Sequence, residues 1–285
     1  MCSSDLGAPC YNLDFNAMRR DEIAHLFQSR AQANTLSLVE ANKGLFDGVN
    51  PDGSDSNAEL AKLLGLPVIL VIDTMGMTRG IAPLLLGYCA FDADVRIKGV
   101  ILNKVGGARH EGKLRTAVET FTDLVVVGSV WRDPALSIGE RHLGLTTPAE
   151  IAHKEELIAG FGDIIARSVD LDAVRAIAAG APELAPANKG AGQPSSAGRG
   201  LRIGIARDAA FAFYYADDLQ SFEQSGATLV PIDMINDKAL PDIDGLFIGG
   251  GFPEIQMAKL SANSDMRHHL KAALGNGLPC YAECG

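Results

Sequence analysis

The chain has 285 residues, of which 47% are hydrophobic and 21% are charged, and its formal net charge is −10. This length allows two domains, each with a sizeable core, and the composition is that of an ordinary soluble globular protein. The acidic charge argues against a nucleic-acid-binding surface, and no apolar run approaches the roughly 18 residues that cross a bilayer. We therefore expect neither a nucleic acid nor a membrane as a partner.

The N-terminal part of the chain alternates apolar runs with helical stretches. The runs are rich in Val, Ile and Leu, as buried parallel strands are, and they cover residues 34–39, 67–72, 95–102 and 123–127. Helices are predicted at 56–64, 78–91 and 110–120, with one or two more within 150–179. This repeated order of strand then helix predicts a doubly wound α/β domain over residues 1–184.

Residues 185–200, APANKGAGQPSSAGRG, are rich in Pro, Gly, Ser and Ala and are predicted to form a linker. A second alternation then occupies residues 201–285. Strands are predicted there at 201–206, 228–232, 245–248 and 278–282, and helices at 215–225 and 263–274. The fold class expected for the whole chain is therefore α/β, with two doubly wound domains.

The five cysteines are odd in number and form no CxxC pair, so they predict neither a disulfide framework nor a zinc site. A reducing cytoplasm fits this usage best. The first six residues are too short and polar for a signal peptide, and they join a segment typical of the middle of a domain. We therefore expect a cytoplasmic protein whose N-terminus is incomplete.

The final segment, YAECG, places Cys284 where a predicted strand ends. Ala282 and Gly285 leave the room that the sharp turn of a nucleophile elbow requires. The alternative for an isolated cysteine in an apolar strand is a buried structural thiol, which suits Cys280 better. A thiol nucleophile normally has a histidine partner, yet none of the six histidines is obviously placed for it; His268 and His269 are expected on the surface.

Three glycines, Gly249, Gly250 and Gly251, follow the strand predicted at 245–248. Because they lack a Cβ, their backbone N–H groups can approach a ligand closely and hold an oxyanion. Taken alone, an ordinary glycine turn is an equally good interpretation. The position of Cys284 one predicted strand further along the chain favours the oxyanion interpretation.

Two carboxylates follow the first predicted strand of the chain. The segment VEANKGLFDG holds Glu40 and Asp47 in a glycine-punctuated loop, at the position where open α/β sheets bind ligands. Carboxylate oxygens there suit Mg²⁺ and phosphate chemistry. A plain turn at Asp47 and a helix cap at Glu40 are the alternatives.

Asp73 and Asn103 each end a predicted strand, so both are expected at the carboxyl edge of the sheet. Asp73 is a candidate to support a metal or nucleotide, and a helix cap is the alternative. Five cationic residues could contact an acidic ligand or phosphates, although solvent-facing salt bridges are the commoner role. They are Arg79, Arg109, His110, Arg141 and His142.

Motifs in both halves resemble those of the cobyrinic acid a,c-diamide synthase family. They are RIGIARDAAFAFYYADDL, DGLFIGGGFPE and LPCYAECG in the second half, and VEANKGLFDG in the first, where Ala41 replaces a glycine of the family's VEGxxGLFDG. The resemblance covers nearly all of residues 7–285 except the linker. It implies a P-loop, dethiobiotin-synthetase-like domain, followed by the first part of a flavodoxin-like class I glutamine amidotransferase domain over residues 201–285.

The resemblance also implies an activity. It is the amidation of the a and c carboxylates of cobyrinic acid in cobalamin biosynthesis, with ATP as co-substrate, L-glutamine as nitrogen donor and Mg²⁺ as cofactor. By the same resemblance Cys284 attacks glutamine, Gly249 to Gly251 contact the oxyanion, Glu40 and Asp47 lie near the metal, phosphates or activated carboxylate, and Asn103 reads adenine. Whether the macrocycle contains cobalt, is metal-free or is sirohaem stays open, and so does a homodimer.

The family's phosphate loop and partner histidine have no counterpart in these residues. No G-x-x-x-x-G-K-[ST] stretch occurs; the resemblance places that loop before the chain begins and the histidine after it ends. The chain is therefore expected to be truncated at both ends. Two other functions stay open: a cysteine hydrolase or isolated glutaminase, and a non-catalytic nucleotide-fold scaffold.

Overall fold

The computed structural model describes residues 10–31, 36–137, 154–183 and 196–284, which divide into two compact units. The N-terminal unit holds the described residues of Leu13–Ile138 and Glu156–Ala191. The C-terminal unit holds those of Gly192–Gly285, with short stretches from Met1–Asn12 and Gly139–Glu155. The boundaries given above for the two domains and the linker stay predictions. No helix in the described part is both long and apolar enough to span a membrane.

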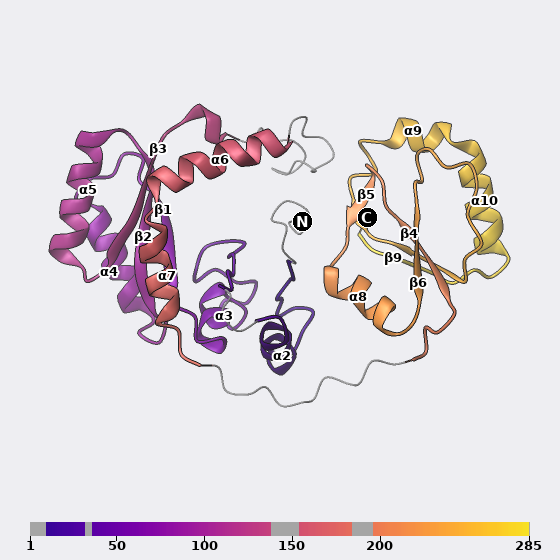
Figure 1. The fold of residues 1–285 in the computed structure, drawn as a ribbon, viewed down its shortest axis with the longest axis horizontal. Helices are drawn as coiled ribbons and strands as arrows, with labels where there is room; N and C mark the ends of the chain where they lie inside the picture. Colours follow the sequence, from indigo (N-terminus) through magenta and orange to yellow (C-terminus); the bar gives the residue numbers. More distant parts are fainter. Residues whose placement is uncertain (1–9, 32–35, 138–153, 184–195, 285) are drawn as a thin grey trace. The chain divides into compact units, whose positions relative to one another are not determined.

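The N-terminal unit is built on a three-stranded parallel sheet in the order β1-β2-β3. The strands are β1 (Val68–Asp73), β2 (Ile97–Val105) and β3 (Val125–Trp131), close to three of the four predicted runs. Between them run the crossover helices α4 (Ile81–Phe91) and α5 (Ala108–Phe121), as parallel strands require. Figure 1 shows α4 and α5 on one side of this sheet and α7 (Leu171–Ala179) on the other.

The two faces of this sheet are packed differently. On the α4 and α5 face, Val100, Leu102 and Leu114 are among the fully buried side chains, each of which stabilises the fold by roughly 1.5–3 kcal/mol. On the α7 face the backbones approach closely. A Cβ at Gly128 would lie only 2.8 Å from the Val169 side chain, so the absence of a side chain there permits the contact.

Further helices complete the described part of the N-terminal unit: α2 (Arg20–Arg30), α3 (Asn57–Leu63), the short 3-10 turn η1 (Pro134–Leu136) and α6 (Lys154–Ser168). α3 begins at Ser56, whose hydroxyl accepts the Glu59 N–H. The sequence patterns do not predict α2. Its amphipathic pattern is weak, and Ile23, packed near Leu60 and Leu64, is its buried residue.

The strand predicted at 34–39 does not form. Residues 34 and 35 lie outside the described part, and residues 36–40 have no regular structure. Leu36 is 56% exposed and Leu38 is 84% exposed, so neither is buried in a sheet. An apolar run becomes a strand only when a neighbouring strand pairs with its backbone N–H and C=O groups, and none does so here among the described residues.

The C-terminal unit has a four-stranded parallel sheet in the order β6-β4-β7-β9. The strands are β4 (Arg202–Ala206), β6 (Thr228–Ile232), β7 (Gly245–Ile248) and β9 (Cys280–Ala282), all within the predicted ranges. From β4 the chain moves outward to β6 and then returns past β4 to β7, so the strand order reverses there. In open α/β sheets such a switch point marks the place where ligands bind, at the carboxyl ends of the strands.

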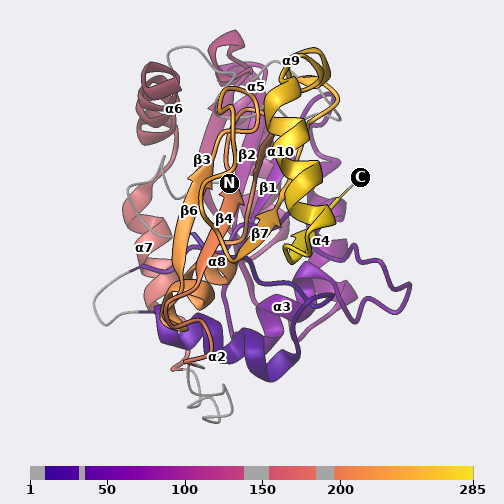
Figure 2. The ribbon, with the colours of Figure 1, turned by 90° about the vertical axis from the view of Figure 1, so that its right-hand side faces the viewer.

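Helices cover both faces of this sheet. α8 (Ala216–Gln224) lies on one side, and α9 (Met257–Ala262) and α10 (Ser264–Gly275) lie on the other (Figures 1 and 2). Successive residues of β7 point to opposite faces: Phe247 contacts the ring of Phe222 in α8, whereas Leu246 joins Met266 of α10 in the core. Both units are thus layered α/β structures with parallel sheets, which confirms the predicted fold class.

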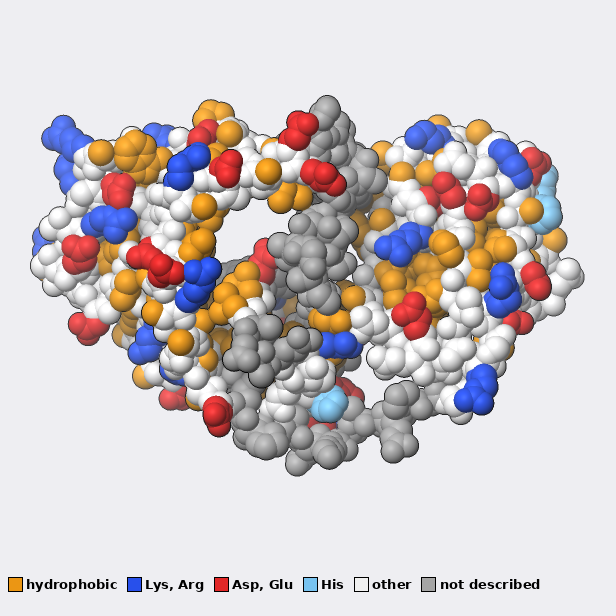
Figure 3. Space-filling view, in the orientation of Figure 1, with side chains coloured by type: hydrophobic (Ala, Val, Ile, Leu, Met, Phe, Trp, Pro, Cys, Tyr) orange, Lys and Arg blue, Asp and Glu red, His pale blue; other side chains and the backbone are white. Residues whose placement is uncertain are grey.

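The surface charges are mixed, and many are paired. Figure 3 shows Lys and Arg interspersed with Asp and Glu on the face in view. In the N-terminal unit the Lys62 ammonium contacts the carboxylates of Glu59 and Asp92, 2.7 Å away in the case of Asp92. The hydrogen bonds to these carboxylates raise the pKa of Lys62 to about 12, and the bond to Asp92 has the largest effect. Paired cations of this kind differ from cations that have no carboxylate partner among the described residues.

Candidate functional site

The C-terminal unit brings Cys284 and the glycine loop together at the carboxyl edge of its sheet. Ile248 of β7 pairs with Ala282 of β9, and the Glu283 N–H donates to the Ile248 carbonyl oxygen at 3.0 Å. Gly250 and Cys284 each stand two residues beyond that pair. A Cβ built on Gly250 would lie 3.5 Å from the Cβ of Cys284. The strand register therefore sets the candidate nucleophile against the candidate oxyanion loop.

Cys284 has a backbone conformation that few residues with a side chain adopt. Its φ is 72°, in the left-handed region, which costs roughly 1–3 kcal/mol for a residue other than glycine. Strained turns at strand ends are where nucleophile elbows expose their reactive atom. Cys284 is also exposed, so a substrate can reach it.

Cys280 does not match the buried structural thiol predicted for it. It is exposed, like the other residues of β9. The reason is the position of β9 at the edge of the sheet, where the described residues supply no layer that covers it. His268 and His269 are both exposed on α10, as expected.

Close packing explains why two of the three loop residues are glycine. The segment β5 (Phe211–Phe213) pairs antiparallel with β8 (Gly250–Gly251) and brings its backbone against the loop. A Cβ at Gly249 would collide with the Phe213 carbonyl oxygen and lie 2.7 Å from the Tyr214 ring. A Cβ at Gly251 would collide with the Ala210 carbonyl oxygen. Gly250 is the glycine of the three that lies against Cys284.

Tyr214 links the ends of two strands at this edge, and motif reasoning missed it. Its hydroxyl accepts the Gly249 N–H at 3.0 Å and donates to the Ala206 carbonyl oxygen at the end of β4. Burial raises the pKa of this hydroxyl, so it stays protonated at neutral pH. The Gly249 N–H is thus already engaged, whereas Gly250 is the glycine that lies against Cys284.

Asp208 shapes the segment that packs on the glycines. One carboxylate oxygen accepts the N–H groups of Ala210 at 2.7 Å and Phe211 at 3.0 Å, and the other accepts that of Met234 at 2.7 Å. The sequence did contain a signal, since an Asp just after a strand is typical of a turn in which the side chain caps backbone N–H groups.

Acidic side chains gather near the same edge. Burial, followed by the charges of Asp217 and Glu283, raises the pKa of Asp218 at the start of α8. A hydrogen bond to Glu283 raises the pKa of Tyr281. Glu283 is the residue before Cys284, so the surroundings of the thiol include negative charge as well as backbone amides.

In the N-terminal unit, Asp73 and Asn103 lie side by side, paired at the ends of β1 and β2. Asp73 accepts a hydrogen bond from the Lys104 ammonium at 2.8 Å and another from the Met75 N–H at 3.0 Å. The ammonium holds the pKa of Asp73 below its usual value. Asn103 Oδ1 accepts the Lys104 N–H at 2.9 Å. The structure therefore brings these two candidates together, both engaged with Lys104.

Glu40 and Asp47 lie in a loop anchored beside α3, and both are exposed. The Asn57 side chain donates to the carbonyl oxygens of Lys43 and Gly44 at 3.2 Å, which fixes the loop to the helix. No group of three or more His, Cys, Asp or Glu that could hold a metal occurs in the described part of the chain. Glu40 and Asp47 do carry carboxylate oxygens, the kind of ligand by which proteins hold Mg²⁺ together with water and substrate phosphates.

The cationic candidates have different environments. Arg79 stacks over the Phe121 ring at 5.1 Å. His110 bridges two loops, and Arg109 lines a cavity. Arg141 and His142 lie outside the described residues.

Comparisons with known proteins match both halves of the chain. Residues 202–285 match the CobB/CobQ-like glutamine amidotransferase domain, and residues 11–138 match an AAA domain. A cobyrinate a,c-diamide synthase from Magnetococcus marinus is 40% identical over 98% of this chain and 61% of its own length. The chain is similar to cobyrinate a,c-diamide synthases. The synthase from Methanosarcina acetivorans is 40% identical over 98% of this chain and 59% of its own length. The synthase from Dehalococcoides mccartyi is 40% identical over 97% of this chain and 60% of its own length.

These comparisons confirm the resemblance to cobyrinate a,c-diamide synthases that the motifs indicated. The similarity extends over both units rather than over the glutamine amidotransferase region alone. The chain spans about 60% of the length of the curated synthases that it matches. No solved structure matches it at a comparable level of significance.

Proposed function

We propose that this protein amidates the a and c carboxylates of cobyrinic acid in an ATP- and glutamine-dependent ligase reaction of cobalamin biosynthesis. The observation that carries the proposal is the placement of Cys284, exposed and in a left-handed conformation, against Gly250 at the carboxyl edge of the second sheet. The names of its relatives and the two matched domains support the same reaction.

In the C-terminal unit the reaction begins at the sulfur. The Cys284 thiolate attacks the carbonyl carbon of the glutamine side-chain amide, and the developing oxyanion receives the Gly250 N–H. The amide nitrogen takes up the proton that the thiol gave up, the C–N bond breaks, and ammonia leaves as a glutamyl thioester forms. Water then hydrolyses the thioester to glutamate and the free thiol. Tyr214 acts through Gly249, because its hydrogen bond fixes the peptide that leads into Gly250.

In the N-terminal unit the proposed step is activation of a carboxylate. ATP transfers its γ-phosphoryl group to the carboxylate, which gives an acyl phosphate and ADP, and ammonia then displaces phosphate to form the amide. Glu40 and Asp47 would hold Mg²⁺, which spreads the charge of the phosphates. Asp73 and Asn103, paired at the ends of β1 and β2, are proposed to contact the nucleotide.

The alternatives account for less of the chain. A cysteine hydrolase or isolated glutaminase would use the same thiol but leaves the N-terminal unit without a role. A scaffold gives no reason to hold Cys284 in a costly conformation beside a glycine loop.

The decisive experiment replaces Cys284 by Ser in a protein that contains this chain and spans the length of its relatives. Glutamine-dependent amidation should fall by a factor of about 10³ or more, while amidation with free ammonia is retained. The matched control is Cys280→Ser, an exposed cysteine on the same edge strand, which should preserve both activities. Loss of the ammonia-dependent reaction in Cys284→Ser would contradict the assigned role.

A second substitution tests the N-terminal unit. Asp47→Asn should slow amidation by a similar factor with glutamine and with ammonia, because the ATP-dependent step precedes the use of either. Asp52→Asn is the matched control, since Asp52 lies in the same loop and accepts the Ser54 N–H at 2.9 Å, a bond that an amide oxygen can keep. An unchanged rate with ammonia would remove Asp47 from the site.

Product analysis settles the identity of the macrocycle. Cobalt-containing and metal-free cobyrinic acid and sirohaem are supplied separately, and the amidated products are identified by mass. The proposal requires two amidations of a cobyrinic acid. Exclusive amidation of sirohaem would replace that substrate.

A further inference from the structure

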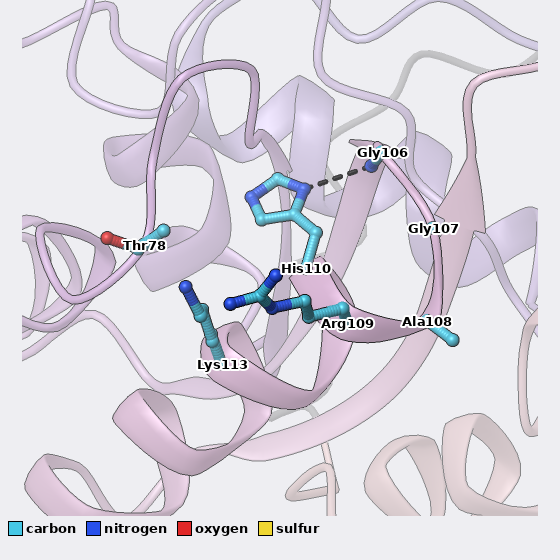
Figure 4. Close-up of a pocket in the computed structure, with 7 residues that line it drawn as sticks. All are labelled: Thr78, Gly106, Gly107, Ala108, Arg109, His110 and Lys113. Carbon is cyan, nitrogen blue, oxygen red and sulfur yellow. Dashed lines mark hydrogen bonds between the residues drawn. The ribbon is translucent and has the colours of Figure 1, made fainter.

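The N-terminal unit contains a cavity that the proposed chemistry at Cys284 does not use. It has a volume of about 530 Å³ and is lined by Thr78, residues 106–108, Arg109, His110 and Lys113. An adjoining cavity of about 330 Å³ shares three of these residues and adds Lys104 and Arg132. Both lie where β1 and β2 end. Figure 4 shows that Arg109, His110 and Lys113 come from the start of α5 and that Thr78 lies on the loop opposite.

Three cations around the two cavities have no acidic partner among the described residues. No carboxylate of the described residues lies within 4 Å of Arg109, Lys113 or Arg132, whereas Lys104 pairs with Asp73 and Arg115 of the same helix pairs with Glu111. The first-turn acid of α5, Glu111, is directed elsewhere, since its second oxygen accepts the Trp131 indole N–H at 2.8 Å. Positive charge at the cavity is therefore uncompensated in this part of the structure.

Arg109 and Lys113 repel one another on the helix. They stand four residues apart on α5, so they share a face, and like charges at this spacing destabilise a helix by a few tenths of a kcal/mol. They also lie near the positive end of the helix dipole, where acidic groups rather than basic ones are favourable. A bound anion would offset both effects, because it attracts both cations and favours the positive end of the helix dipole.

The walls of the cavity are braced. His110 Nδ1 accepts the Gly106 N–H at 2.9 Å, so the remaining ring proton sits on Nε2 and is donated to the Met77 carbonyl oxygen at 2.6 Å. The ring thereby ties the loop after β1 to the loop after β2. Gly107, at φ 125°, begins this 14-residue helix without a side-chain cap, and residues of the first turn, Ala108 to His110, line the cavity.

We propose that this cavity binds a polyanionic reactant through its carboxylate or phosphate oxygens, with Arg109, Lys113 and Arg132 as its charged contacts. Several cations spread over two adjoining cavities suit a ligand with more than one anionic group. Anion binding itself does not depend on the proposed amidation. Assigning the anion to the macrocycle or to the nucleotide does rest on that function.

Trp131 provides the measurement, because it is the single tryptophan of the chain, precedes Arg132 and is hydrogen-bonded to the first turn of α5. Its fluorescence is followed as propane-1,2,3-tricarboxylate or pyrophosphate is added, and calorimetry repeats each titration. We expect saturable binding, at least tenfold weaker in the Arg109→Ala/Lys113→Ala double variant. Added NaCl should weaken binding by the wild type more steeply than binding by the variant.

Lys98→Ala is the matched control. Lys98 is exposed near the start of β2, eight residues before Gly106 and thus about 26 Å away along the strand. This variant should bind both probes like the wild type. Absence of saturable binding by both methods, or equal affinity in the double variant, would overturn the proposal.

The two probes distinguish the sources of the anion. Tighter binding of the tricarboxylate assigns the cavity to the carboxylates of the macrocycle, and tighter binding of pyrophosphate assigns it to the nucleotide. These titrations need no turnover. A negative result would therefore overturn anion binding at the cavity without bearing on the amidation that the Cys284→Ser experiment tests.

Discussion

The carboxyl edges of the two sheets are built in contrasting ways. In the C-terminal unit the edge is closed by backbone packing: β5 presses on the glycines, and Tyr214 joins the ends of β4 and β7. In the N-terminal unit the edge is open: Asp73 is bound to Lys104, and a cavity is lined by cations that no carboxylate of the described residues pairs with.

The difference follows from what each edge is proposed to do. An oxyanion is stabilised by backbone N–H groups held in fixed positions, so rigid close packing is useful beside a nucleophile. A large charged reactant needs space and opposite charge, which exposed side chains around an open cavity supply. Steric substitutions should therefore be most harmful at the C-terminal edge, and charge substitutions should have small effects on stability at the N-terminal edge.

The largest effect is expected for Gly251→Ala. Its Cβ would collide with the Ala210 carbonyl oxygen, which belongs to the backbone and cannot rotate away. We expect the C-terminal unit to lose about 3 kcal/mol or more of unfolding free energy. Urea unfolding followed by circular dichroism measures this loss, and Trp131 fluorescence reports on the N-terminal unit in the same sample.

Gly275→Ala is the control for that substitution. Gly275 ends α10, and a Cβ there meets no atom within 4 Å. Alanine should be neutral or stabilise the helix by up to about 1 kcal/mol. Equal unfolding midpoints for the two variants would show that close packing at Gly251 is not what the loop requires.

Tyr214→Phe should have the next largest effect. It keeps the half-buried ring but removes the hydroxyl that the Gly249 N–H and the Ala206 carbonyl oxygen bind, at a cost of about 1–3 kcal/mol. Glutamine-dependent activity should fall more than ammonia-dependent activity. Tyr88→Phe is the control, because Tyr88 contacts the Phe46 ring and its hydroxyl makes no hydrogen bond to described residues. An effect on stability as small as that of Tyr88→Phe would contradict the linking role.

Asp218→Asn should stabilise the protein, and by less than Tyr214→Phe destabilises it. The folded-state pKa of Asp218 is raised above 3.8, so the wild type loses stability as the pH rises from 3.8 through that folded pKa. The gain in the variant should therefore be absent at low pH and full at pH 7. Unfolding is measured in urea across this range.

Asp265→Asn separates this effect from that of the helix dipole. Asp265 lies in the first turn of α10 and is exposed, so losing its charge should destabilise the helix slightly at pH 7. Destabilisation of similar size in Asp218→Asn would contradict the burial of repelling carboxylates at that edge.

The smallest effect is expected for Asp73→Asn. It keeps the acceptor for the Met75 N–H but loses the charge pair with Lys104, whose side chains are 46% and 50% exposed. The loss should be the smallest of the series, because an exposed ion pair adds little to stability. Because the pKa of Asp73 is lowered in the folded state, this stabilisation is present above pH 3.8 and disappears as the pH falls through the folded pKa. Trp131 fluorescence in urea at two pH values measures it, and a loss as large as that of Tyr214→Phe would indicate a buried pair instead.

The sequence alone determined most of the regular structure. Hydrophobic periodicity is a local property, so the strands at 68–73, 202–206 and 245–248 and the helix at 108–121 could be predicted from neighbouring residues. The motifs also indicate Cys284 and the glycine loop as candidate site residues.

The tertiary structure decided what depends on residues distant in sequence. Pairing of β5 with β8 shows why Gly249 and Gly251 lack side chains, and Tyr214 connects segments that no periodic pattern relates. The apolar run at 34–39 fails as a strand for the converse reason, since no described strand pairs with it. Whether a cation is paired likewise depends on which carboxylates the fold brings within reach. Local patterns encode which element forms, whereas backbone partners and charge neighbours exist only once the chain has folded.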